Sequence, residues 1–492
     1  MGFPAREVAF DTRAMTSGRL PLRAAAVSFA LLASLSPRAS FAGGSPTVYD
    51  NQNLHLMGSR AAGMGGAYTA LACDEVALHY NPASLACARH SHLELVANAY
   101  MVQSLSIPGA YGQGQDIGAT TYHSIPSAVG AVYILSEGEE DTGRYRQAFG
   151  FLITVPASIA LKADPTSPST RNFLSATVRD DVLAGDLGYG IQLLPNLALG
   201  ASLGGAIRIL NQSTSVLVTN PIAPNATEFV SLDEDAEALA LGLRAKLGAR
   251  YTPTQRLSVG LSVATPSLDV YGSYKSSTNV AYAGFGENGA PVLDAAPVRY
   301  TGKSAASFPM KVSAGVAYSG ERLTVSGDVS LSLPRDVRQA YDLVPVRVEG
   351  VEPTASENTV LSRVLTPNVG LGAEVRVTRG VAVAMGAFTD FSTVKATTSE
   401  EDRIHMFGLT GALSLTGSQT RGTFGLSFSY GEASTIVRKG EFSLATISNP
   451  ATGTSTLSRW NLVGVIGSSY AFLPDDVAAK AMEEKQGKPK PP

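Results

Sequence analysis

The sequence predicts an all-β membrane protein: an antiparallel, up-and-down outer-membrane β-barrel of about fourteen strands with a small helical plug at its N-terminus. Three observations lead to this fold class. The chain opens with an export signal, most of it alternates between apolar and polar residues, and short and long connections alternate along it. The 492 residues carry a formal net charge of −3, which lacks the basic excess that is typical of nucleic-acid binders.

The first 42 residues have the features of a secretory signal peptide. An apolar run at 24–35 precedes the small-residue site Ser40-Phe41-Ala42, and it follows Arg13, Arg19 and Arg23. The run is too short to span a bilayer as a helix, which takes about 20 apolar residues. We expect cleavage after Ala42, with Met1 or Met15 as the start of the precursor. A buried N-terminal helix is the alternative reading.

Residues 91–472 are expected to form the barrel wall, because their apolar residues recur with period two. In 256–263, Leu257, Val259, Leu261 and Val263 share one face, and Ser258, Gly260 and Ser262 share the other. Strict alternation of this kind predicts strands. The same pattern recurs at 91–103, 183–193, 196–210, 239–251, 322–331, 369–377, 407–415 and 424–430.

The connections between these strands alternate in length. Short turns are expected at 194–196, 252–255, 319–321, 378–380 and 417–422. Long polar loops are expected at 156–181, 211–236, 266–300, 334–364, 392–402 and 431–456. Short periplasmic turns and long outer loops are typical of outer-membrane barrels, and an even strand count leaves both termini in the periplasm. A soluble β-sandwich, the alternative, has only about 7–9 strands in a domain of about 100 residues.

The polar face of the strands must line the lumen. A charged side chain that met lipid at the bilayer midplane would cost about 2–4 kcal/mol, so the Leu/Val face points outward. The charges expected to face the lumen are Asp186, Arg208, Arg244, Lys246, Asp328, Glu374 and Arg376.

The segment 43–90 is expected to form a plug inside the barrel. It is rich in small residues, it lacks the alternation, and it has a helix-compatible stretch at about 67–80 that Pro82 ends. Small residues can pack closely against a barrel wall, and Asn81-Pro82 fixes a turn. We assign plug or gating roles to Gly63, Gly65, Gly66, Asn81, Pro82 and Ala83. The alternative is an N-terminal arm that lies below the barrel.

The stretch GSRAAGMGGAYTALACDEVALHYNPASLA, at 58–86, resembles the N-terminal signature of the FadL-type outer-membrane transporters of hydrophobic compounds. Further similarities are Phe308-Pro309-Met310-Lys311 and the turn at 251–257. The resemblance implies a fourteen-stranded barrel with an N-terminal hatch. It also implies passive uptake of long-chain fatty acids or aromatic hydrocarbons, which leave sideways through a gap in the wall. Two departures are Cys73, where the family often has acidic residues, and a charged tail at 473–492.

The cysteines and histidines of the plug could form a disulfide or a metal site. We expect no metal, because no paired C-x-x-C spacing is present. Cys73 and Cys87 are either unlinked or joined in a disulfide, which an oxidising compartment permits. No nucleophile motif surrounds His123 or His405, so we expect no enzyme and no cofactor.

The leading functional hypothesis is an uptake channel in the bacterial outer membrane. We expect a monomer, with outer-membrane lipid and a hydrophobic small molecule or fatty acid as its partners. Two alternatives stay open from the sequence: a non-transporting scaffold or shuttle of a protein secretion machine, and a general porin.

Overall fold

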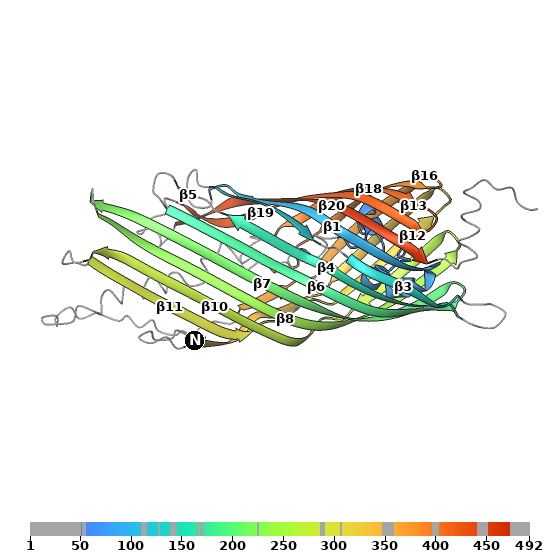
Figure 1. Cartoon of the computed structure of the whole chain (residues 1–492), viewed down its shortest axis with the longest axis horizontal. Helices are drawn as coiled ribbons and strands as arrows, with labels where there is room; N and C mark the ends of the chain where they lie inside the picture. The colour runs from blue at the N-terminus through green and yellow to red at the C-terminus, as the bar shows by residue number, and fades with distance from the viewer. Residues whose placement is uncertain are drawn as a thin grey trace, which may run out of the picture.

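The computed structural model is a closed antiparallel β-barrel (Figure 1). The structure describes residues 51, 56–109, 116–125, 128–137, 145–163, 166–167, 172–223, 226–285, 291–305, 308–346, 359–395, 403–439 and 451–472. The expected signal peptide and the tail after Phe472 lie outside these residues. No helix among the described residues is long and apolar enough to cross a membrane.

Fourteen strands form the closed wall, as the sequence predicted. In order around the barrel they are β1 (Ser91–Ile107), β3 (Ala128–Ser136), β4 (Gln147–Ala163), β6 (Asn172–Leu194), β7 (Leu197–Ala223), β8 (Ala226–Thr254), β9 (Leu257–Ala264), β12 (Lys311–Ser319), β13 (Leu323–Ser332), β16 (Thr366–Thr378), β17 (Val381–Asp390), β18 (His405–Thr416), β19 (Thr420–Lys439) and β20 (Ala451–Phe472). The first and last strands close the ring, with Ser91 opposite Phe472.

The remaining strands lie beside the wall or extend it. They are β2 (Ile117–Ile125), β5 (Thr166–Ser167), β10 (Leu268–Phe285), β11 (Pro291–Lys303), β14 (Arg335–Val346) and β15 (Thr359–Arg363). β2 pairs with the outer half of β1, while β3 pairs with its other half.

The predicted strand phase is confirmed. Leu261 is 48% exposed on the outside of β9, whereas its neighbour Ser262 is 4% exposed on the inside. The same alternation of exposed Leu or Val with buried small or polar residues runs through β13 and β16. The apolar face therefore points to lipid and the polar face to the lumen.

The prediction of long polar loops between the strands is largely wrong, because strands occupy most of those residues. β7 continues to Ala223 and β8 begins at Ala226, so most of the loop expected at 211–236 is a paired hairpin. Likewise β10 and β11 fill most of 266–300. In Figure 1 these strands run far beyond the part of the barrel that holds the plug. Beyond the membrane, both faces of a strand can meet water, so the apolar alternation that revealed the other strands is absent there.

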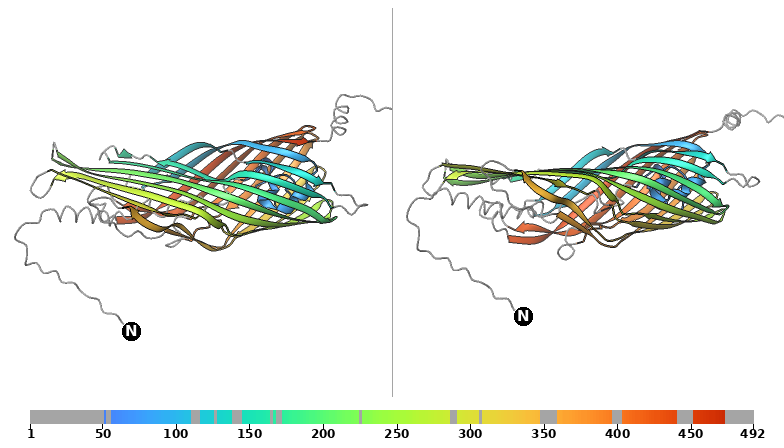
Figure 2. Two further views of the ribbon diagram at one scale, coloured as in Figure 1. Left: turned by 60° about the horizontal axis from the view of Figure 1, so that its bottom comes forward. Right: turned by 90° about the horizontal axis from the view of Figure 1, so that it is seen from below.

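The plug lies inside the barrel at the end of the short turns, as Figure 2 shows for the blue segment. It contains two short helices, α2 (Ser59–Gly63) and α3 (Ala77–Tyr80), and a 3₁₀ helix, η3 (Pro82–Cys87). The helix expected at about 67–80 is therefore wrong except for its last turn. The backbone N–H groups of Tyr68 and Thr69 donate to the wall residue Asp328 instead of to helical carbonyls.

Candidate functional site

The plug packs directly on wall backbone where inward positions of the wall are glycine. A Cβ placed on Gly386 of β17 would lie 2.3 Å from the backbone nitrogen of Gly65. A Cβ on Gly200 of β7 would lie 2.4 Å from the nitrogen of Ala83. Neither position can accept a side chain without displacing plug backbone. The glycines of the wall thus shape a socket for the plug.

Charged groups of the wall hold one half of the plug. Arg60 of α2 forms a two-pronged ion pair with Glu374 of β16, with N–O distances of 2.8 and 2.9 Å. One oxygen of Asp328, on β13, accepts hydrogen bonds from the backbone nitrogens of Tyr68 at 2.8 Å and Thr69 at 2.7 Å. Charge-assisted hydrogen bonds of this kind are about twice as strong as neutral ones.

The other half of the plug is held at its Asn-Pro turn. The side-chain nitrogen of Asn81 donates to the carbonyl oxygens of Thr69 and Ala249, each at 3.0 Å, and so bridges plug and wall. Its side-chain oxygen accepts from the nitrogen of Ala83 at 3.2 Å and caps η3. Pro82 stands at the first position of η3, where its missing N–H costs nothing.

The glycines predicted to matter in the plug lie where the chain turns. Gly65 and Gly66 have φ angles of 61° and 72°, which favour glycine. Gly63 faces the wall, since a Cβ on it would lie 2.6 Å from the Cβ of Ala412. Gly63 and Gly65, with Asn81 to Ala83, form part of the contact between plug and wall. Their role in gating stays a prediction.

Six of the seven predicted lumen charges lie on the inside of the wall, and five of them are nearly inaccessible. Their exposed fractions are 4% for Asp186, 2% for Arg208, 4% for Lys246, 8% for Asp328 and 8% for Glu374. The sixth, Arg244, lies 3.8 Å from Asp186. The buried Arg208 is paired with Asp180, 2.7 Å away. Asp180 was not among the predicted lumen charges.

Arg376 differs from the other six. It has the same strand phase as Glu374, but it lies at the end of β16 and is exposed. Its guanidinium group donates to the carbonyl oxygen of Glu321 in a neighbouring turn, at 3.2 Å.

Cys73 and Cys87 form a disulfide that joins the middle of the plug to the end of η3. Among the residues that the structure describes, no group of three or more His, Cys, Asp or Glu side chains could hold a metal ion.

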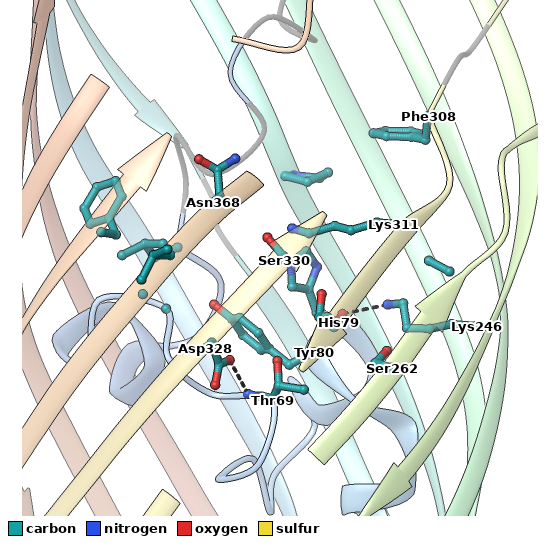
Figure 3. Close-up of a pocket in the computed structure, with 18 of the residues that line it drawn as sticks. Thr69, His79, Tyr80, Lys246, Ser262, Phe308, Lys311, Asp328, Ser330 and Asn368 are labelled. Carbon is teal, nitrogen blue, oxygen red and sulfur yellow. Dashed lines mark hydrogen bonds between the residues drawn. The ribbon is translucent and has the colours of Figure 1, made fainter. Parts of the chain in front are cut away.

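A cavity of about 120 Å³ lies between the plug and the wall strands β4, β8, β9, β12, β13, β16 and β17 (Figure 3). Three cationic side chains line it: Arg244, Lys246 and Lys311. Figure 3 shows Lys246, Lys311 and His79 pointing into the same space. Apolar side chains line another part, namely Leu56, Pro156, Phe308, Pro309, Val369 and Phe388. Polar side chains line the rest, among them Asn51, Thr69, Tyr80, Ser262, Asp328 and Asn368. The surface of the cavity therefore combines an apolar part with a polar part, in which three cations outnumber one carboxylate.

Two of the three cations have specific neighbours. The ammonium group of Lys246 donates to the carbonyl oxygens of Leu78 and His79 at the end of α3, the second at 2.8 Å. The guanidinium carbon of Arg244 lies 5.1 Å from the ring centre of Phe308. Burial, together with these nearby cations, lowers the pKa of His79 well below its usual value, so His79 is neutral.

Sequence reasoning missed two members of this cavity, His79 and Lys311. Lys311 ends the Phe308-Pro309-Met310-Lys311 stretch that carried part of the family resemblance. That stretch was the one sequence feature that could have identified Lys311 as a site residue. No local pattern set His79 apart from the other histidines of the plug.

The wall next to the cavity has an interrupted backbone ladder. β4 pairs with β3 as far as Thr154, and from Ala157 onward its described pairing is with β6 alone. β2, in turn, pairs with β1 alone in the described residues. The interruption falls beside Pro156, which lines the cavity. The side chain of Gln103 on β1 partly replaces the ladder, because its oxygen accepts from the nitrogen of Ala160 at 3.5 Å.

No family model matches the sequence, and no curated protein matches it. Solved structures are similar in fold. A Pseudomonas aeruginosa FadL homologue is 13% identical with a TM-score of 0.55, and the match covers 85% of this chain and 99% of that one. The P. putida toluene transporter TodX is 14% identical with a TM-score of 0.56, over 85% and 99% of the two chains. The Ralstonia pickettii toluene transporter TbuX is 17% identical with a TM-score of 0.52, over 86% and 100%.

At these identities the likeness is one of fold, and it covers most of the chain. It agrees with the resemblance that residues 58–86 carry in the sequence. The chain has the outer-membrane barrel fold of FadL homologues and toluene transporters.

Proposed function

We propose that this protein is an uptake channel of the outer membrane for hydrophobic molecules that end in a carboxylate, such as long-chain fatty acids. The proposal rests above all on the cavity beside the plug. Three cations, Arg244, Lys246 and Lys311, converge there and outnumber the one carboxylate in the lining, that of Asp328. The similar structures include toluene transporters, but a neutral hydrocarbon offers no charge to pair with one buried and two partly buried cations.

The cavity suits the head of such a ligand rather than the whole molecule. Its volume of about 120 Å³ is below the roughly 300–1,000 Å³ of pockets that enclose drug-sized ligands. A carboxylate near the three cations leaves its acyl chain to run along Phe308 and Phe388 into the lumen. Removal of charge from water is costly, and an opposite charge already in place offsets that cost.

Ligand and plug compete for the same cation in this proposal. Lys246 donates to two plug carbonyl oxygens, and it also lines the cavity. A carboxylate binds an ammonium group more strongly than a neutral carbonyl does. Arrival of the ligand head therefore weakens the attachment of α3 to the wall. Local movement of the plug, rather than its ejection, is the expected response, because the Arg60–Glu374 pair lies elsewhere.

We propose that the ligand leaves sideways between β2 and β4. Passage through an intact barrel wall would require breaking a backbone ladder, and the described ladder is interrupted there. Pro156 brings the interruption next to the cavity, and it has no N–H with which to restore pairing. A route at this place delivers a greasy ligand into the membrane rather than into water.

Binding of two ligands that differ only in charge tests the proposal. The purified protein is titrated at neutral pH with a fluorescent long-chain fatty acid and with the alcohol of the same chain length. We expect the acid to bind at least about tenfold more tightly. Lys311→Met should remove most of that difference, whereas Lys275→Met, on the exposed part of β10, should not. Equal affinities for acid and alcohol would contradict the carboxylate specificity.

Cross-linking tests the sideways exit. Cysteines at Thr121 on β2 and Ala160 on β4 are joined with a bis-maleimide reagent, and uptake into vesicles is measured before and after. We expect uptake to stop while binding persists. A matched pair at Ser427 and Val463, across the intact β19–β20 ladder, is the control. Uptake that survives the first cross-link would rule out this exit.

A further inference from the structure

We propose that Gln103 controls the sideways exit by moving its side-chain amide between two partners, the edge of β4 and Asn461 of β20. This role of Gln103 depends on the exit proposed between β2 and β4. Gln103 lies on β1, the strand that pairs with both β2 and β20, and its exposed fraction is 0%.

In the structure the amide of Gln103 is bonded to β4. Its oxygen accepts from the backbone nitrogen of Ala160 at 3.5 Å. Ala160 lies beyond Thr154, where the described pairing of β4 with β3 ends. A backbone nitrogen can only donate, so the oxygen of the amide must be the atom that faces it. The bond is long for its type, so it holds the edge of β4 weakly.

Asn461 offers Gln103 a second partner. The two residues lie directly opposite each other in the β1–β20 ladder, and Asn461 is 1% exposed. Among the residues that the structure describes, neither the side-chain nitrogen of Gln103 nor the side-chain oxygen of Asn461 has a hydrogen-bond partner. Opposite residues of an antiparallel pair have Cβ atoms about 4.5–5.5 Å apart. A rotation of the Gln103 side chain therefore brings this donor to this acceptor.

The two positions of the amide compete with each other. Asn461 lies on one side of β1, and β4 lies on the other side, beyond β2 and β3. Extension toward β4 therefore draws the amide away from Asn461, in agreement with the two atoms that lack partners. Each position satisfies two polar groups and leaves two without a partner, so the two positions are close in free energy. A small perturbation can then shift the population from one to the other.

The second position opens the proposed exit. Release of Ala160 frees the edge of β4 on the strand whose Pro156 lines the cavity. A greasy chain that passes between β2 and β4 offers no donor or acceptor to replace the lost bond. The alternative partner at Asn461 offsets part of that loss, because a buried polar group without a partner is costly. Gln103 thus holds the exit closed in one position and lowers the cost of opening it in the other.

Hydrogen exchange at the Ala160 amide measures the two positions without any ligand. It is followed by NMR on the full-length protein in micelles. Gln103→Met removes the acceptor and should raise the exchange rate by about tenfold. Asn461→Leu removes the second partner and should lower the exchange rate. The two residues face each other, so a general loosening of the wall would raise exchange in both variants.

Ser104→Ala is the control, because it removes a bond of 3.2 Å to Thr120 at the next position of β1 and leaves Gln103 in place. It should exchange like the wild type, and unheated gel mobility confirms that each variant is folded. An unchanged rate in Gln103→Met, or a raised rate in both variants, would overturn the proposal.

Uptake of a fluorescent fatty acid into vesicles separates this proposal from the exit itself. We expect uptake to rise in Gln103→Met and to fall in Asn461→Leu, with the binding affinity unchanged in both. Opposite shifts in exchange without any change in uptake would support the two positions of Gln103 and contradict the sideways exit.

Discussion

The ammonium group of Lys246, on wall strand β8, lies 2.8 Å from the carbonyl oxygen of His79 on the plug. Lys246 is 4% exposed, and the same side chain lines the cavity. One buried cation thus belongs both to the attachment of the plug and to the proposed ligand site. Through Lys246 alone, binding of the proposed ligand would affect the attachment of the plug.

Lys246→Met should therefore have two effects. It removes hydrogen bonds from a charged donor, each of which contributes about 1.5–3 kcal/mol, so the plug should detach more often and single-channel recordings should show more openings. Binding of a fatty acid should weaken as well. Lys275→Met, at an exposed position of β10, should change neither property. An unchanged opening frequency in Lys246→Met would mean that this lysine does not hold the plug in place.

Gly386→Leu should expel the plug from its socket. A Cβ on Gly386 would lie 2.3 Å from plug backbone, and a larger side chain has no space at all. We expect a folded barrel with raised ion conductance in planar bilayers. Gly422→Leu is the matched control, because a Cβ there meets nothing within 4 Å. Similar conductance in both variants would mean that the close packing at Gly386 does not seat the plug.

Leu261→Arg and Ser262→Arg test which face of β9 meets lipid and which meets the lumen. The first places a charge in lipid and should impair folding by about 2–4 kcal/mol if it lies near the midplane, measured by urea titration in vesicles. The second points into the polar cavity, so the barrel should fold, but the added side chain should obstruct fatty-acid binding. Equal folding defects would contradict the assigned strand phase.

His79 should make plug docking sensitive to acid. Its pKa is lowered in the docked state by burial and by Lys246, Arg244 and Lys311, which face it. An undocked His79 regains a pKa of about 6.5, so docking is unaffected above that pH and loses stability as the pH falls below it.

We expect conductance to rise between about pH 7 and about pH 5.5, and His79→Gln to remove that component. Burial and the neighbouring Glu94 raise the pKa of Glu75, which acts in the opposite direction by favouring docking at low pH. The informative quantity is therefore the difference between wild type and His79→Gln. No difference between them would exclude His79 as the sensitive group.

The sequence revealed the wall wherever the two faces of a strand meet different environments. Leu261 and Ser262 alternate because one meets lipid and the other the lumen. The outer half of β7 was not predicted as a strand, because its residues do not alternate between apolar and polar.

Tertiary contacts explain why the helix expected at about 67–80 was wrong and why two cavity residues were missed. Tyr68 and Thr69 lie in a segment with helical composition, yet Asp328 takes their backbone hydrogen bonds from 259 and 260 residues away. His79 and Lys311 meet only because β12 and the plug share the lumen. A local pattern carries no information about such pairs.

Deletion of the plug shows whether this segment seals the lumen and contributes to the ligand site. A variant that lacks residues 43–88 of the precursor is reconstituted in planar bilayers for conductance and in vesicles for fatty-acid uptake. If the plug seals the lumen and carries part of the ligand site, the variant folds, conducts ions more than the wild type, and loses its preference for fatty acid over the matching alcohol. A folded variant with wild-type conductance and an unchanged preference would contradict the account.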